Sequence, residues 1–164
     1  MTSILVTGAT GQIGQELRLL ATRFPQLHFR FLEKKELDIT DKVLIDNLFR
    51  LQRPDFCINC AAYTAVDKAE SEPALAHAIN VDGVSHLAAA CARAGATLIH
   101  FSSDYVYHNT QNTPLRETDP TAPQSVYART KLAGEAAALE LCPATMIIRT
   151  SWVYAGFRHN FVKT

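Results

Sequence analysis

Residues Ile4 to Gly14 read ILVTGATGQIG, and this stretch decides the fold. The apolar run 4–7, with its β-branched side chains, predicts a buried strand that stops at Gly8. From Gln12 the apolar side chains recur at helical spacing, so we expect a helix to follow the turn directly. A strand, a glycine-rich turn and a helix in this order are typical of the first unit of a dinucleotide-binding sheet.

The glycines of this turn indicate a phosphate-binding role. Glycine lets the backbone bend tightly and approach a ligand closely, while the start of the helix offers free N–H groups to a pyrophosphate. The alternative is a tight strand-to-helix turn without a ligand. The cofactor-binding residues expected in the turn are Gly8, Gly11, Gln12, Ile13 and Gly14.

Glu33 follows the second expected strand and is a candidate for the ribose of the cofactor. An acid at this distance from the glycine turn can hydrogen-bond an adenosine ribose, which favours NAD. Lys34 and Lys35 come next in the sequence, and their ammonium groups would suit the 2′-phosphate of NADP instead. The residues leave NAD and NADP open.

Strands and helices alternate through the rest of the chain. Such alternation, with helices of crossover length, predicts a single α/β domain, a doubly wound parallel sheet of Rossmann-like form. Ser71 and Pro73 are expected to start the longest helix and Gly95 to end it. Further strands are expected at 28–32, 56–60, 97–102 and 145–149, helices at 42–53, 71–94 and 125–141, and a polar loop at 108–124.

The composition excludes several classes of protein. The chain has 164 residues, 48% of them apolar and 20% charged, and its formal net charge is zero. A nucleic-acid binder or a protein of anionic membranes would usually show a basic excess, and no apolar stretch approaches the length of a bilayer span. We expect no signal peptide, because residues 4–14 already form the first structural unit. Four scattered cysteines in apolar patterns predict free thiols in the cytoplasm.

Tyr127 and Lys131 are candidates for proton transfer. They are four residues apart in an expected helix and therefore share one of its faces. A lysine ammonium beside the phenol would lower the pKa of Tyr127 and make it a proton donor near neutral pH. The spacing alone also fits a solvated helix face. Ser102 and Ser103 end the fourth expected strand, at the edge where ligands bind in such sheets, although hydroxyl groups also close strands through local backbone bonds.

Several longer motifs make the chain similar to the extended short-chain dehydrogenase/reductase family, and within it to enzymes that reduce dTDP-linked 4-keto sugars. The motifs span nearly the whole chain. They are Gly8–Gly14, Leu37–Asp41, Arg53–Asp55, Asn59–Pro73, Phe101–Tyr107, Tyr127–Glu135 and Arg149–Gly156.

The resemblance implies a role for each residue that matches the family's motifs. Tyr127 would donate a proton to the substrate carbonyl, and Lys131 would assist it and hold the nicotinamide ribose. Ser103, where the family usually has threonine, would polarise the carbonyl oxygen. The pyrophosphate of the cofactor would lie against Gly11, Gln12 and Ile13, and its adenine side against Asp38 and Ile39. Three residues after the third strand would also line the cofactor, namely Ala62, Tyr63 and Thr64. Asp104 and Trp152 would contact the sugar nucleotide.

By the same resemblance, the expected function is reduction of dTDP-4-dehydro-L-rhamnose to dTDP-L-rhamnose by NADPH or NADH, for cell-surface polysaccharide. The alternatives are an NAD(P)-binding regulatory subunit without catalysis, or a related nucleotide-sugar epimerase or dehydratase. Family members continue with a C-terminal substrate-binding part, and a longer form is expected as a homodimer. Residues 1–164 would then be the dinucleotide-binding domain alone, ending at the start of another helix near Asn160.

Cys57 and Cys60 match the C-x-x-C pattern of redox and zinc sites. In a strand, however, residues three apart face opposite sides, so these thiols would not converge on one ion or form a disulfide. The six histidines are dispersed as well. No metal site is expected.

Overall fold

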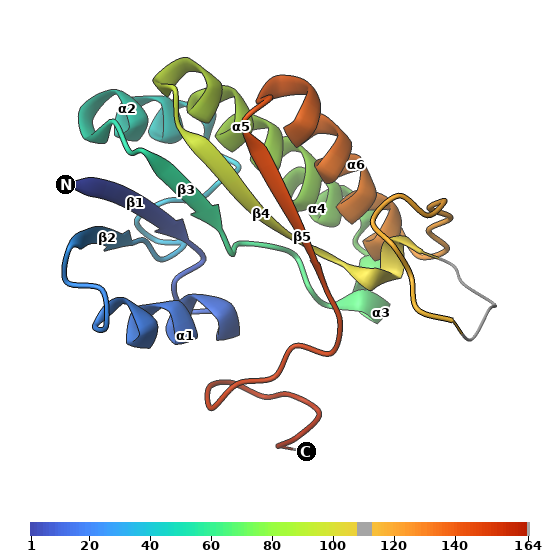
Figure 1. Ribbon diagram of the computed structural model, residues 1–164. Helices are drawn as coiled ribbons and strands as arrows, with labels where there is room; N and C mark the ends of the chain where they lie inside the picture. Colours follow the sequence, from blue (N-terminus) through green and yellow to red (C-terminus); the bar gives the residue numbers. More distant parts are fainter. Residues whose placement is uncertain (108–112, 164) are drawn as a thin grey trace.

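A computed structural model of the chain describes residues 1–107 and 113–163 (Figure 1). Five parallel strands form one sheet in the order β2-β1-β3-β4-β5. The elements are β1 Thr2–Thr7, α1 Gln12–Ala21, β2 Leu27–Phe31, α2 Lys42–Gln52, β3 Phe56–Asn59, α3 Val66–Ala69, α4 Pro73–His77, the π-helix η1 Ala78–Asp82, α5 Gly83–Ala94, β4 Thr97–Ser103, the short 3₁₀-helix η2 Asp104–Val106, α6 Val126–Leu141 and β5 Thr145–Thr150.

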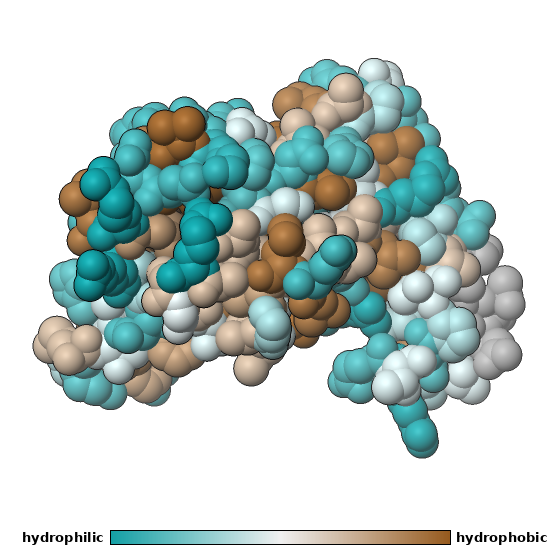
Figure 2. Space-filling view, turned by 90° about the horizontal axis from the view of Figure 1, so that it is seen from above, coloured by the Kyte–Doolittle hydropathy of each residue, from teal (hydrophilic) through white to brown (hydrophobic). Residues whose placement is uncertain are grey.

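Helices lie on both faces of the sheet, so the expected α/β fold is confirmed. Helices α2, α5 and α6 pack side by side on one face, and α1 lies on the other beneath β1 and β2 (Figure 1). Figure 2 views the molecule from above, where apolar residues appear among hydrophilic ones. The main core fills the space between the sheet and the layer of α2, α5 and α6, and includes Leu5, Ile45, Phe49, Leu87 and Leu98.

The direction of the crossovers reverses at the middle of the sheet. Strand β1 pairs with β2 on one side, in the register Val6 to Phe31, and with β3 on the other, in the register Thr7 to Asn59. Crossovers that leave a parallel sheet in opposite directions open a crevice at the carboxyl ends of the strands. The glycine turn leaves β1 at this point.

The helices expected over 42–53 and 125–141 begin with side-chain caps, whereas the cap expected at Ser71 is absent. Asp41 accepts a hydrogen bond from the Leu44 amide at the start of α2, and Ser125 accepts one from the Ala128 amide at the start of α6. Ser71 was expected to cap the helix that begins near Pro73, and this expectation is wrong. Its hydroxyl donates to the Lys68 carbonyl instead, because the unforeseen helix α3 ends there.

The long helix expected over 71–94 is interrupted by a π-helix. The run begins at Pro73 and ends before Gly95, which takes the left-handed conformation at φ 70° as the sequence predicts. Between α4 and α5, however, residues Ala78–Asp82 form η1, where one wider turn displaces the backbone. The buried Asn80 lies at its centre.

The last described residues fold back over the start of α1. Arg158 donates from Nε to the Thr10 carbonyl at 2.8 Å, and the Gly156 amide donates to the Glu16 carboxylate at 3.2 Å. A helix was expected to begin near Asn160, but the structure has turns there. The Asn160 side chain donates to the Ala155 carbonyl and so stabilises a turn rather than a helix.

Two further expectations concern loops and membranes. The polar loop expected at 108–124 is confirmed for 113–124, and its residues 108–112 lie outside the described part. Within residues 1–107 and 113–163, helices of the length and apolar character needed to cross a bilayer are absent.

Candidate cofactor and active site

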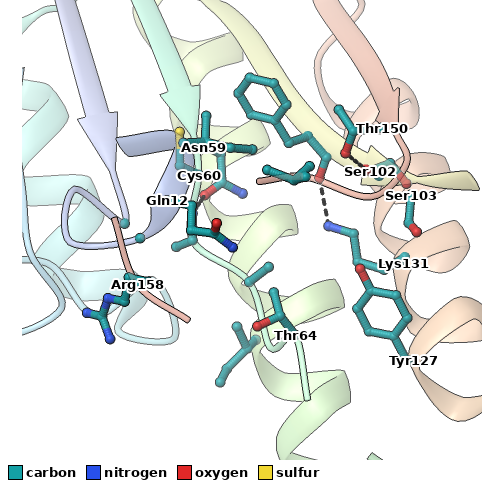
Figure 3. Close-up of a pocket in the computed structure, with 18 of the residues that line it drawn as sticks. Gln12, Asn59, Cys60, Thr64, Ser102, Ser103, Tyr127, Lys131, Thr150 and Arg158 are labelled. Atoms are coloured by element: carbon teal, nitrogen blue, oxygen red, sulfur yellow. Dashed lines mark hydrogen bonds between the residues drawn. The ribbon is translucent and has the colours of Figure 1, made fainter. Parts of the chain in front are cut away.

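A cavity of about 690 Å³ opens at the carboxyl ends of the strands. The glycine turn and the residues after β2 and β3 form one side of it, and the end of β4 and helix α6 form the other. Figure 3 shows Tyr127 and Lys131 projecting from the same helix toward the strand ends, with Gln12 and Arg158 across the cavity. A single cavity thus joins the two groups of residues that the sequence singles out.

The backbone of the turn explains two of its glycines. Gly8 has a φ of 63°, and a Cβ atom there would lie 2.6 Å from the Ala61 amide nitrogen. At Gly14 a Cβ atom would lie 2.6 Å from the Gly8 carbonyl oxygen. Both positions therefore need glycine for the fold itself. At Gly11 a Cβ atom would lie 3.2 Å from the Gly8 carbonyl oxygen, a tight contact but a looser one than at Gly8 and Gly14, so packing constrains this glycine less.

Most of the expected site residues line this cavity. The exceptions are Gly14, which is buried beneath the turn, Tyr63, whose hydroxyl donates to Glu72 at 2.8 Å, and Glu33. The expected residues that do line it are Gly8, Gly11, Gln12, Ile13, Asp38, Ile39, Ala62, Thr64, Ser103, Asp104, Tyr127, Lys131 and Trp152.

Glu33 instead lines a neighbouring cavity of about 500 Å³ together with Arg18 and Arg158. Its carboxylate forms an ion pair with Lys35 at 3.1 Å. Lys34 lines the main cavity and lies 3.6 Å from the Asp38 carboxylate. Charges of both signs therefore lie close to the expected ribose position, which agrees with the open choice between NAD and NADP.

Tyr127 is partly buried in an apolar environment, although its spacing to Lys131 predicts a lysine ammonium beside its phenol. Burial raises the pKa of Tyr127, and the nearby Ser103 hydroxyl opposes this shift only in part. Its ring packs edge-on against Tyr105, with the ring centres 6.0 Å apart. The expected lowering of the Tyr127 pKa by a lysine ammonium is therefore wrong for this structure. The phenol is neutral at physiological pH and holds its proton.

Lys131 directs its amine to the end of β4. The side chain is almost completely buried, and Nζ donates to the Phe101 carbonyl oxygen at 2.7 Å (Figure 3). Burial lowers the pKa of Lys131 to about 8, while the Glu135 carboxylate opposes this shift. The lysine is thus a group that exchanges a proton close to neutral pH.

Asp104 organises the side of the cavity expected to meet the sugar nucleotide. Its carboxylate accepts from the Ser103 hydroxyl at 3.2 Å and from the Ser151 hydroxyl at 2.7 Å. Trp152 follows Ser151, is largely exposed, and packs edge-on against Phe161. These bonds join the end of β4 to the segment after β5.

Sequence reasoning missed two residues that hold the site together. Asn80, in the π-helix, accepts from the Tyr63 amide at 2.9 Å and donates to the Tyr63 carbonyl and to the Thr130 hydroxyl. It thereby fixes the loop after β3 against α6, next to Lys131. Arg158 brings a cation to the glycine turn. An asparagine inside an apolar helix pattern was the available signal for Asn80; Arg158 had none.

The described residues contain no cluster of three or more histidine, cysteine or acidic side chains placed to hold a metal ion. All four cysteines, at 57, 60, 91 and 142, are free thiols.

The description "RmlD substrate binding domain" belongs to a family model that matches residues 1–164, the whole chain. The chain belongs to this family. Its relatives include the dTDP-4-dehydrorhamnose reductase of Salmonella typhimurium, which is 45% identical over 164 residues covering 99% of this chain and 55% of the relative. The RmlD-family chain spans about half the length of the curated relatives it matches.

Solved structures of the same kind of enzyme superpose closely on this RmlD-family chain. The dTDP-4-dehydrorhamnose reductase of Clostridium acetobutylicum is 40% identical, with a TM-score of 0.95, and the match covers 99% of this chain and 57% of that one. The Bacillus anthracis enzyme, solved in complex with NADP, is 38% identical, also with a TM-score of 0.95, over 99% and 58% of the two chains.

Proposed function

We propose that this chain is the cofactor-binding and catalytic part of an oxidoreductase that reduces dTDP-4-dehydro-L-rhamnose to dTDP-L-rhamnose in nucleotide-sugar biosynthesis. The observation that carries the proposal is that Ser103, Tyr127 and Lys131 line the same cavity as the glycine turn. The reductases of Salmonella typhimurium and Clostridium acetobutylicum, at 45% and 40% identity, support the choice of substrate.

The cavity fits NADP or NAD. Gly11, the residue before α1, has no side chain to cap the helix, so the amides of Gln12 and Ile13 are placed to receive the pyrophosphate. Ser102 lines the cavity with a buried hydroxyl that has no hydrogen-bond partner in the described part of the chain. Such a group calls for a polar ligand. Lys34 and Arg158 add cations suited to phosphates. When bound, the cofactor supplies a hydride.

The side chains of α6 and β4 handle the proton and the carbonyl oxygen. Tyr127 keeps its proton because burial raises its pKa, so it donates that proton to the alkoxide that develops on the substrate. Ser103, beside Tyr127, donates a hydrogen bond to the same oxygen. Lys131 holds the ribose and replaces the proton of Tyr127, because its own pKa of about 8 allows exchange.

We also propose that residues 1–164 form the dinucleotide-binding domain and that the grip on the nucleotide sugar comes mostly from a part outside this chain. Ser103, Asp104 and Trp152 alone leave the substrate open to water, and Trp152 itself is largely exposed. Positioning of reactants accounts for roughly 7 kcal/mol or more of barrier reduction at best. We expect the domain to bind cofactor and to be a poor reductase alone.

One experiment tests both proposals. NADPH and NADH oxidation with dTDP-4-dehydro-L-rhamnose is measured for this chain and for the chain joined to the remaining part of the Salmonella typhimurium relative. We expect turnover in the joined form only, and cofactor binding by calorimetry in both. Equal turnover in the two would contradict the domain proposal. Cofactor binding without turnover in either, in a folded joined protein, would favour a regulatory subunit.

The four thiols and the charge balance support a cytoplasmic protein that binds neither nucleic acid nor membrane. A homodimer of a longer form stays a prediction.

A further inference from the structure

A line of buried polar side chains crosses the sheet and ends at Lys131. The Thr7 hydroxyl on β1 donates to Asn59 Oδ1 on β3 at 2.7 Å. Asn59 Nδ2 lies 3.0 Å from His100 Nδ1 on β4, and His100 Nε2 lies 3.5 Å from Lys131 Nζ on α6. Thr7, Asn59 and His100 are all at most 1% exposed. None of these three residues has a role in the proposed mechanism.

One backbone amide fixes the polarity of this line. The Ala61 N–H can only donate, and it lies 3.0 Å from the atom assigned as Asn59 Oδ1. Turning the amide around would place the Asn59 NH₂ group against this donor, and also deprive Thr7 of its acceptor. The oxygen therefore faces Ala61, and the NH₂ group faces His100.

It follows that His100 has one defined tautomer. Because Asn59 donates to Nδ1, this nitrogen must be the unprotonated acceptor of the ring. Burial, followed by the charge of Lys131, lowers the pKa of His100 to about 3, so the imidazole is neutral at physiological pH. A neutral ring without a proton on Nδ1 carries it on Nε2, and this N–H is directed at Lys131.

The N–H of His100 distinguishes the two forms of Lys131. An ammonium at Nζ would meet another donor at 3.5 Å, whereas an amine offers a lone pair to that N–H and still donates to the Phe101 carbonyl. Among the other charged groups around Lys131, Glu135 favours the ammonium. The Glu135 carboxylate is itself paired with Arg149 of β5.

The remaining groups on neighbouring elements act less directly. Tyr127, one turn earlier on α6, holds its proton and is neutral. Asp104 of η2 is engaged with the hydroxyls of Ser103 and Ser151. The contact of α6 with the π-helix is made by the neutral Asn80 and Thr130. His100 is therefore the polar group whose orientation decides which form of Lys131 is satisfied.

We propose that His100 is a positioning residue for Lys131: fixed by Asn59 as the Nε2–H tautomer, it stabilises the amine form of the lysine over the ammonium. This rests on the proposed function for its catalytic meaning, because a lysine that readily gives up its proton is suited to resupply Tyr127. The tautomer and the protonation of Lys131 do not depend on that function. They are properties of the folded chain.

The test uses NMR on the chain without cofactor. In the wild type, the ¹⁵N shifts of His100 are expected to show a protonated Nε2 and a bare Nδ1, unchanged from about pH 5 to about pH 9. In His100→Phe, the titration of Lys131 followed at its ¹³Cε is expected to move upward by roughly one pH unit. The matched control is His86→Phe on α5, whose ring faces the Ile39 carbonyl and which should leave the Lys131 titration unchanged.

Three results would overturn the proposal: a proton on Nδ1 of His100 in the wild type, or a Lys131 titration in His100→Phe that is either unmoved or shifted downward. If the imidazole of His100 only fills space, the Lys131 titration should not move. If His100 had the opposite tautomer, its bare Nε2 would accept from the ammonium, and the Lys131 titration should shift downward in His100→Phe. If His100→Phe does not fold, the tautomer in the wild type still decides. No readout requires turnover, so loss of the proposed reductase activity and failure of this inference are separate outcomes.

Discussion

Lys131 Nζ lies 2.7 Å from the carbonyl oxygen of Phe101, two residues before Ser103 on β4. This bond fixes α6 against the end of the strand, so the helix residue and the serine approach the cavity together. It also commits one lysine proton to the backbone. The chemistry proposed for the site depends on this arrangement.

Burying Lys131 should make stability depend on pH in a defined window. The folded chain releases the lysine proton at about pH 8, whereas the unfolded chain keeps it to about pH 10.4. Between these values the unfolded state binds more protons, so the free energy of unfolding rises with pH, by roughly 3 kcal/mol. Urea unfolding of Lys131→Met across this range should lack that rise. The same variant should bind cofactor more weakly, and an identical pH profile would contradict the assignment.

Tyr127→Phe removes the proposed proton donor and little else. In the form joined to the Salmonella typhimurium part, turnover should fall by about a hundredfold to ten-thousandfold, as is typical when one positioned acid is lost. The cofactor dissociation constant should change little, and calorimetry checks it. Tyr105→Phe is the control, because Tyr105 packs against Tyr127 at a centroid distance of 6.0 Å. If Tyr105→Phe were the inactive variant, Tyr105 and not Tyr127 would be the proton donor.

Two glycines of the turn should respond differently to substitution. Gly11→Val should cost about 1–2 kcal/mol of stability, because Gly11 is the N-cap of α1, where valine is disfavoured, and a Cβ atom there lies 3.2 Å from the Gly8 carbonyl oxygen. It should nevertheless abolish cofactor binding by blocking the pyrophosphate. Gly8→Ala combines a φ of 63° with a Cβ atom 2.6 Å from the Ala61 amide, and should cost roughly 3 kcal/mol. Calorimetric titration and urea unfolding separate the two effects. Unchanged affinity in Gly11→Val would argue against the phosphate site.

The ion pair of Glu135 and Arg149 should stabilise the chain more than any surface pair. Arg149 donates to both carboxylate oxygens, from Nε at 3.0 Å and from Nη2 at 2.6 Å, and Glu135 is almost fully buried. Glu135→Gln leaves the guanidinium poorly compensated and should cost about 3 kcal/mol in urea unfolding. Lys42→Met, which removes an exposed pair with Asp46, should cost less than about 1 kcal/mol. Equal costs would show that burial of the pair is unimportant.

The sequence predicts the sheet because its signals are local. Apolar runs, Pro73 and Gly95 mark strands and helix ends from their immediate neighbours, and the glycine turn indicates which end of the sheet binds the ligand. The π-helix is different. It depends on hydrogen bonds between Asn80 and both Tyr63 and Thr130, which are distant in sequence. A local sequence pattern therefore does not predict it.

The sequence predicts most of the residues that line the cavity, but it does not predict their hydrogen-bond partners or their pKa shifts. The spacing of Tyr127 and Lys131 places both on one helix face, yet which partner each side chain finds is set by Phe101 and His100 on β4. Burial then changes both pKa values in directions that spacing does not reveal. Glu33 lines a neighbouring cavity, whose wall is completed by Phe157 and Arg158 from the end of the chain, and no local pattern predicts that contact.

The parallel sheet also decides when the site comes into being. Every described strand pairs with a partner across an intervening helix, so residues 1–107 and 113–163 contain no hairpin that would form quickly from neighbouring residues. Contacts of this kind are slow to form and leave apolar edges uncovered meanwhile. During synthesis on a ribosome, β1 with its glycine turn emerges first, but the cavity forms only after β3, β4 and α6 have also been synthesised. The cavity is therefore among the last features to assemble, and a nascent chain would depend on protection from aggregation until Lys131 has left the exit tunnel.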